Sequence, residues 1–137
     1  MDRIIAVATA AVRRAKNQRS FLDEIQATCG IKVKVLSEEE EATLVYRGVI
    51  NSMDVPKGII LEIGGGSTKI IYYNRRNMLN YASLPFGAVT LTDLSKDDGL
   101  TPERQADQIE ALFSEQLTQI EWLSEVELAV QMIGVGG

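Results

Sequence analysis

A run of three glycines between two stretches rich in β-branched residues is the part of this 137-residue sequence best suited to bind a ligand. Glycine lets a chain adopt positive φ and approach a ligand closely, and successive backbone N–H groups in such a turn form a concave anion site. Two serine/threonine hydroxyls follow and add donors. The pattern predicts a phosphate-binding loop between strands at residues 59–63 and 69–73, made of Gly64, Gly65, Gly66, Ser67 and Thr68.

Better-known glycine loops fit this pattern less well. A Walker A loop requires Gly-Lys-Ser/Thr before a helix, whereas Lys69 follows Ser67 and Thr68 and precedes a predicted strand. The dinucleotide fingerprint requires a third glycine at the position of Lys69. The alternative without a ligand is an ordinary glycine hairpin, although three consecutive glycines would weaken it. The carboxylate of Glu62 lies directly before the glycines and favours a phosphate site with an adjacent acid.

Four consecutive glutamates, residues 38–41, open a predicted helix. Ser37 and Glu40 fit a capping box, and a solvated helix start accounts for the first three acids. Glu41 falls at the edge of the apolar face of this helix, where contact with apolar surface raises a carboxyl pKa and suits it to act as a general base. Glu41 and Glu62 together are suited to hold a metal ion or an attacking water beside a phosphate.

Composition limits the partners of this chain. The 45% hydrophobic content is sufficient for a hydrophobic core, and the formal net charge of −5 argues against a broad nucleic-acid surface. The arginine pairs at 13–14 and 75–76 are candidate contacts for a small polyanion. The absence of histidine excludes histidine-based triads and histidine-ligated zinc within this chain. The single cysteine, Cys29, indicates a reducing, cytoplasmic setting, and its place before Gly30 at a helix end predicts a small buried side chain.

The apolar stretch at residues 4–12 is too short to span a bilayer. It also lacks the pattern of a signal peptide, because Asp2 is acidic and residues 13–16 are largely basic instead of forming a small-residue cleavage site. We therefore expect a buried strand running into a helix, and no membrane as a partner.

Alternating helix and strand signals predict an α/β framework that positions these residues. Residues 51–57 read as a linker that divides the chain into parts at 1–55 and 56–137. The predicted strands are 4–8, 31–35, three antiparallel strands between 58 and about 84 with a turn at 74–77, and 128–133. The predicted helical segments are 12–16, 17–28, one beginning at Ser37, and one beginning at Thr101-Pro102 with its apolar face at Ile109, Leu112, Phe113, Leu117 and Ile120.

Three stretches stand in a characteristic order: residues 8–17 (Ala-Thr-Ala-Ala-Val-Arg-Arg-Ala-Lys-Asn), 37–42 (Ser-Glu-Glu-Glu-Glu-Ala) and 63–68 (Ile-Gly-Gly-Gly-Ser-Thr). Together they resemble the Ppx/GppA family of exopolyphosphatases and guanosine pentaphosphate phosphohydrolases, within the superfamily of actin, heat-shock chaperones and sugar kinases. The resemblance implies a ribonuclease-H-like (actin-like ATPase) fold with two lobes and the site in the cleft between them. It further implies a fragment: the end of lobe one (1–55) and the start of lobe two (56–137).

The resemblance also implies an activity and roles for particular residues. The reaction would be hydrolysis of a terminal phosphoanhydride in inorganic polyphosphate or guanosine pentaphosphate, in the cytoplasm. Glu41 would be the catalytic base that activates water, and Arg13 would lie near the bound phosphate. The loop of Gly64, Gly65, Gly66, Ser67 and Thr68 would bind phosphate, and Glu62 would help to place Mg²⁺ or another divalent cation. A homodimer, common in the family, is the implied assembly.

Glu62 and Lys69 depart from the family pattern. Glu62 is one methylene longer than the usual aspartate, and Lys69 stands where an acid is typical, so it either weakens the metal site or adds a phosphate contact. These departures motivate a second hypothesis, a non-catalytic sensor of the same fold that binds polyphosphate or a nucleotide. A third, an ATP-dependent kinase relative, is disfavoured by the helix-borne Glu41. Because the first phosphate loop of the family would precede Met1, we expect negligible activity from the bare chain.

Overall fold

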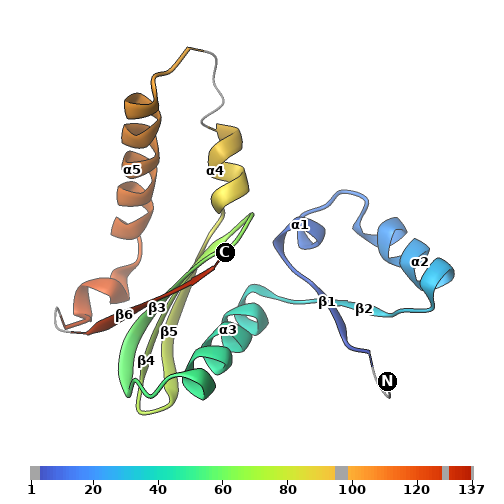
Figure 1. The fold of residues 1–137 in the computed structure, drawn as a ribbon, viewed down its shortest axis with the longest axis horizontal. Helices are drawn as coiled ribbons and strands as arrows, with labels where there is room; N and C mark the ends of the chain where they lie inside the picture. Colours follow the sequence, from blue (N-terminus) through green and yellow to red (C-terminus); the bar gives the residue numbers. More distant parts are fainter. Residues whose placement is uncertain (1–3, 95–98, 128–129, 137) are drawn as a thin grey trace. The chain divides into compact units, whose positions relative to one another are not determined.

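The computed structural model describes residues 4–94, 99–127 and 130–136. The chain forms two compact units, Met1–Leu44 and Val45–Gly137, and the division falls within helix α3 (Glu38–Ser52) (Figure 1). The lobe boundary expected between residues 55 and 56 stays a prediction. Among the described residues, no helix combines the length and apolar character that crossing a bilayer requires.

The first unit contains a two-stranded parallel sheet and short helices. Ala6 of one strand pairs with Val33 of the other, and both strands are shorter than expected at their N-terminal ends. Gly30 ends the helix at Gln18–Cys29 with φ 68°, a left-handed conformation that favours glycine, as the sequence predicts. The predicted burial of Cys29 is wrong. Its side chain is exposed, because the helix that carries it buries none of its side chains. The elements are β1 (Ala6–Ala8), α1 (Ala10–Arg13), α2 (Gln18–Cys29), β2 (Val33–Val35) and the start of α3.

The second unit is built on a four-stranded sheet of order β5-β4-β3-β6. Its strands are β3 (Lys57–Ile63), β4 (Thr68–Asn74), β5 (Asn77–Leu84) and β6 (Gln131–Gly136). The first three form the predicted antiparallel meander, and β6 lies parallel to β3. Arg75 and Arg76 adopt φ of 47° and 62° in the tight turn between β4 and β5, as the turn of a two-residue hairpin requires. The last strand begins later than predicted, and residues 128–129 lie outside the described ranges.

The helices that lie between β5 and β6 in the sequence cover one face of this sheet. Helix α5 (Pro102–Thr118) begins as predicted at the N-cap Thr101, whose hydroxyl accepts the Arg104 N–H. The sequence did not predict α4 (Ala88–Leu94) or the 3₁₀ helix η1 (Glu121–Glu125). The core on this face, here called the helix-side core, comprises Ile59, Ile70, Leu84, Phe86 and Leu91. The predicted apolar face of α5 packs against it, through Ile109, Leu112, Phe113, Leu117 and the following Ile120.

On the opposite face, Tyr46 of α3 packs against Tyr73 of β4, with ring centroids 5.7 Å apart. Both hydroxyls are buried and have no hydrogen-bond partner among the described residues. Burial raises the pKa of both tyrosines above the usual value of about 10. The neutral phenols therefore favour the folded state, and this contribution is fully present below about pH 10 and lost as the pH rises through the raised values.

Replacing Tyr73 by phenylalanine should change the free energy of unfolding at neutral pH by less than about 1 kcal/mol, because the lost hydroxyl makes no hydrogen bond here. The variant should also lose less stability than the wild type between pH 9 and 11. Urea denaturation across this pH range measures both effects, with Tyr81→Phe as a control at a more exposed tyrosine. A loss of about 2 kcal/mol or more at neutral pH would show that the hydroxyl is hydrogen-bonded.

Candidate functional site

The predicted phosphate loop is a tight connection between β3 and β4. The strand pairing ends at Ile63 and Thr68, and the Gly64 N–H donates to the Ser67 carbonyl at 3.0 Å. None of its three glycines has a positive φ; among the described residues the glycines with positive φ are Gly30, Gly99 and Gly136. The expectation of positive φ in this loop is therefore wrong. The loop is instead closely packed around Gly64, where a Cβ would lie 3.2 Å from the Ser67 carbonyl oxygen and 3.1 Å from Glu62 Oε1.

The N-terminus of α4 fixes the orientation of this loop. The Ala88 N–H donates to the Gly64 carbonyl at 2.8 Å, and the Val89 N–H donates to the Gly65 carbonyl at 2.9 Å. In a trans peptide the C=O and the following N–H point in opposite directions. The N–H groups of Gly65 and Gly66 therefore point away from α4. Adjacent N–H groups aimed to one side are the arrangement that binds an anion.

Ser67 and Thr68 are both buried, but they make different contacts. The Thr68 hydroxyl donates to the Phe86 carbonyl at 2.9 Å and so ties the start of β4 to the segment before α4. Since a hydroxyl has a single proton to donate, Thr68 acts in this structure as a support of the loop. Its predicted contact with phosphate stays a prediction. Ser67 is engaged differently, by Lys69.

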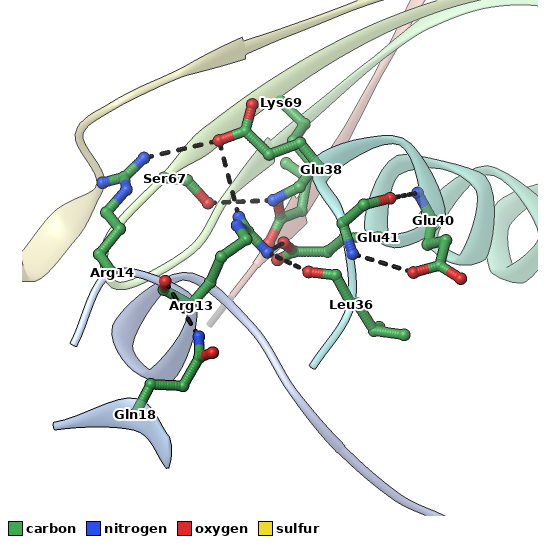
Figure 2. Close-up of polar contacts among 11 residues, drawn as sticks. Arg13, Arg14, Gln18, Leu36, Glu38, Glu40, Glu41, Ser67 and Lys69 are labelled. Carbon is green, nitrogen blue, oxygen red and sulfur yellow. Dashed lines mark hydrogen bonds and ion pairs between the residues drawn. The ribbon is translucent and has the colours of Figure 1, made fainter. Parts of the chain in front are cut away.

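Lys69 and Glu62 face each other across β3 and β4, one residue pair before the loop. Lys69 is fully buried, and its Nζ lies 3.2 Å from Glu62 Oε2 and 3.0 Å from Ser67 Oγ. Figure 2 shows the contact between Lys69 and Ser67. Sequence reasoning noted Lys69 but not this pairing, which follows once the loop is known to span residues 64–67.

The pairing bears on the predicted metal site. Glu62, the predicted ligand for Mg²⁺, already contacts a buried ammonium, and the described residues contain no cluster of three or more potential metal ligands. A divalent cation at Glu62 would lie beside Lys69 and would find no second carboxylate in the loop. The residues of this loop therefore do not fit Mg²⁺ as they stand.

The first unit holds the other predicted site residues. Arg13 Nη1 donates to the Leu36 carbonyl at 2.7 Å and to Glu41 Oε2 at 3.1 Å, and its Nη2 lies 3.7 Å from Glu38 Oε1 (Figure 2). The Arg13 and Glu41 side chains are 18% and 13% exposed, so the guanidinium holds a largely buried carboxylate. The predicted contact of Arg13 with phosphate stays a prediction; in this structure its guanidinium contacts the Leu36 carbonyl and orients the Glu41 carboxylate.

The capping box that begins α3 is confirmed. The Glu40 N–H donates to Ser37 Oγ at 3.1 Å, and the Ser37 N–H donates to Glu40 Oε2 at 2.9 Å. Hydrogen bonds from Lys34 and from the Ser37 backbone hold the pKa of Glu40 below its usual value. These contacts fix the first turn of α3, which carries Glu41. Glu41 precedes the fully buried Ala42, consistent with its predicted place at the edge of the apolar face.

The arginine pair at 75–76 is not brought to the glycine loop. It lies at the Asn74 end of β4, whereas the loop lies at the Thr68 end. Strand β4 is seven residues long, so its two ends lie roughly 20 Å apart at the usual rise per residue. Arg75 and Arg76 therefore do not contact the same phosphate group as the glycine loop.

Replacing Arg13 by glutamine should lower the free energy of unfolding by about 1–3 kcal/mol, because the Leu36 carbonyl and the Glu41 carboxylate lose a charged donor in a largely buried setting. Urea denaturation measures the loss. Arg14→Gln is the matched control, since Arg14 is 41% exposed and its ion pair with Glu38 spans 3.8 Å. Equal stability of the Arg13 variant and the wild type would contradict the positioning role.

The comparisons with known proteins agree with these observations. A solved Ppx/GppA family member from Aquifex aeolicus is 28% identical over 99% of this chain and 43% of its own, with a TM-score of 0.75. An exopolyphosphatase from Cytophaga hutchinsonii is 30% identical over 97% of this chain and 43% of its own, with a TM-score of 0.85. This chain therefore spans less than half the length of either relative.

The fold extends beyond the family. The ethanolamine utilization protein EutJ from Carboxydothermus hydrogenoformans is 17% identical over 98% of this chain and 53% of its own, with a TM-score of 0.50, a likeness of fold alone. These matches confirm the predicted ribonuclease-H-like (actin-like ATPase) α/β fold. The model of the Ppx/GppA phosphatase family matches residues 1–137. The chain belongs to the Ppx/GppA phosphatase family.

Proposed function

We propose that the protein containing this chain is a phosphohydrolase that releases terminal phosphate from inorganic polyphosphate or guanosine pentaphosphate. The observation that carries the proposal is the glycine loop, whose carbonyls accept N–H groups of α4 so that the N–H groups of Gly65 and Gly66 point to the other side. Family membership and the exopolyphosphatase from Cytophaga hutchinsonii support the substrate class.

In this proposal, water attacks the terminal phosphorus and the phosphoanhydride P–O bond breaks. Glu41 accepts a proton from the water, and the shortened polyphosphate leaves as an anion. The backbone N–H groups of the loop stabilise the charge on the phosphoryl oxygens in the transition state. Arg13 keeps the Glu41 carboxylate oriented by donating to Oε2.

The test is phosphate release by the intact protein, supplied separately with long-chain polyphosphate and with guanosine pentaphosphate, in buffer with and without Mg²⁺. Release from one of the two substrates, with the other at least about tenfold slower, would identify the preferred substrate. ATP serves as a control for general hydrolysis of phosphoanhydrides. No release from either substrate would reject the hydrolase.

The second candidate is a non-catalytic sensor that binds polyphosphate or a nucleotide. The ion pair of Lys69 and Glu62 favours it, because a loop that already contains a buried cation can bind phosphate without the acids that hold a catalytic metal. Binding without turnover in the intact protein, with Mg²⁺ present, would support the sensor over the hydrolase.

A further inference from the structure

We propose that the Lys69 ammonium is a built-in cation of the glycine loop, taking the place beside Glu62 that a divalent metal ion would otherwise hold. The inference rests on the proposed function in one respect, that the loop binds phosphate. In this role Lys69 is a positioning residue: it neutralises Glu62 and directs the Ser67 hydroxyl.

The register of the sheet places the Lys69 ammonium beside Glu62. Glu62 and Lys69 are direct partners across antiparallel strands, and an opposite-charge pair in this relation is favourable. The side chain of Lys69 is fully buried, and that of Glu62 is 15% exposed. A buried ammonium is costly unless charged and polar partners surround it. Glu62 and Ser67 are such partners, so these contacts hold the Lys69 ammonium at the base of the loop.

The contact with Ser67 has a direction. A lysine ammonium has three donors and no acceptor, so Ser67 Oγ must accept the hydrogen bond from Lys69. The Ser67 hydroxyl proton therefore points away from Lys69 and can be donated to another group. The adjacent positive charge polarises this hydroxyl and strengthens it as a donor. Lys69 thereby prepares Ser67 to donate to an anion such as a phosphate oxygen.

The charges beside the loop also favour phosphate binding without a metal ion. Glu62 and Lys69 together carry no net charge, so a phosphate approaching the N–H groups of Gly65 and Gly66 meets no uncompensated carboxylate. Two acids at these positions would repel a phosphate unless a metal ion neutralised them. The loop of this chain should therefore bind phosphate without a divalent cation of its own.

Binding of Mn²⁺ to the intact protein tests the inference without requiring activity. The number of tightly bound Mn²⁺ ions, counted by electron paramagnetic resonance of the free ion, should be equal in the wild type and in Glu62→Gln. Lys69→Glu should gain one site, and Mn²⁺ should raise its thermal midpoint by about 4 °C or more, with no such rise in the wild type. A wild-type site that Glu62→Gln removes would overturn the inference.

A second set of variants covers the case in which Lys69→Glu does not fold. Lys69→Gln keeps a donor for Ser67 but removes the charge, and it should weaken the binding of short-chain polyphosphate in EDTA by about tenfold without gaining a Mn²⁺ site. Ser67→Ala should weaken the same binding by a similar factor. Unchanged affinity in both variants would overturn the positioning role. Failure of the wild type to bind polyphosphate would reject the proposed function, while the Mn²⁺ count would still decide what lies beside Glu62.

Discussion

Replacing Glu41 by glutamine in the intact protein is expected to lower kcat for phosphate release by about 10²–10⁴-fold, the range that general-base catalysis contributes. An amide cannot accept a proton from the attacking water. Glutamine has the same shape and keeps a side-chain oxygen that can accept from Arg13, so the first turn of α3 should stay in place. The KM for polyphosphate should change by less than about threefold, since the proposed phosphate loop is untouched.

The matched control is Glu39→Gln. Glu39 lies in the same first turn of α3 and is exposed, so this variant removes the same charge from the helix N-terminus without touching the Arg13 contact. Its kcat should equal that of the wild type within about twofold, because an exposed acid there acts only through the helix dipole. A similar fall in both variants would assign the effect to helix stability. Unchanged turnover in Glu41→Gln would remove Glu41 as the base.

The elements that the sequence predicted are those with strong local signals. Thr101 and Pro102 mark the start of α5, and Ser37 with Glu40 marks the start of α3, because caps act over a few residues. The hairpin at 74–77 follows from turn chemistry in the same way. By contrast, α4 contains Val89, Thr90 and Thr92, which favour strands, and it forms where its N–H groups meet the carbonyls of the glycine loop.

The residues of the candidate site were named from the sequence, but their contacts were not. Arg13 and Glu41 are 28 residues apart, and no periodic pattern links a short helix to the first turn of a later one. The pair of Glu62 and Lys69 was within reach of sequence reasoning, because a four-residue loop at 64–67 places them opposite each other. The burial of Lys69 could not be predicted from the sequence, because it depends on the folded sheet.

Replacing Gly87 by alanine is expected to lower the free energy of unfolding by about 3 kcal/mol and to weaken phosphate binding by about tenfold or more. A Cβ at Gly87 would lie 2.2 Å from the Gly64 carbonyl oxygen and 2.9 Å from the carbonyl carbons of Gly64 and Gly65. All three are backbone atoms, so no side chain can move to make room. Either α4 or the loop must shift, and the hydrogen bonds from Ala88 and Val89 that orient the loop are then lost.

The size of this steric clash decides whether Gly87→Ala raises or lowers the free energy of unfolding. Alanine in place of glycine restricts the unfolded chain and by itself stabilises a protein by about 0.4–1 kcal/mol, less than the cost of the backbone overlap. Gly48→Ala measures the effect of alanine without a steric clash, because Gly48 lies within α3 and has open space around its Cβ position. This variant should be more stable than the wild type. Urea denaturation and polyphosphate titration of both variants measure the contrast. If Gly87→Ala matched the wild type in both, α4 would not be what holds the phosphate loop in its orientation.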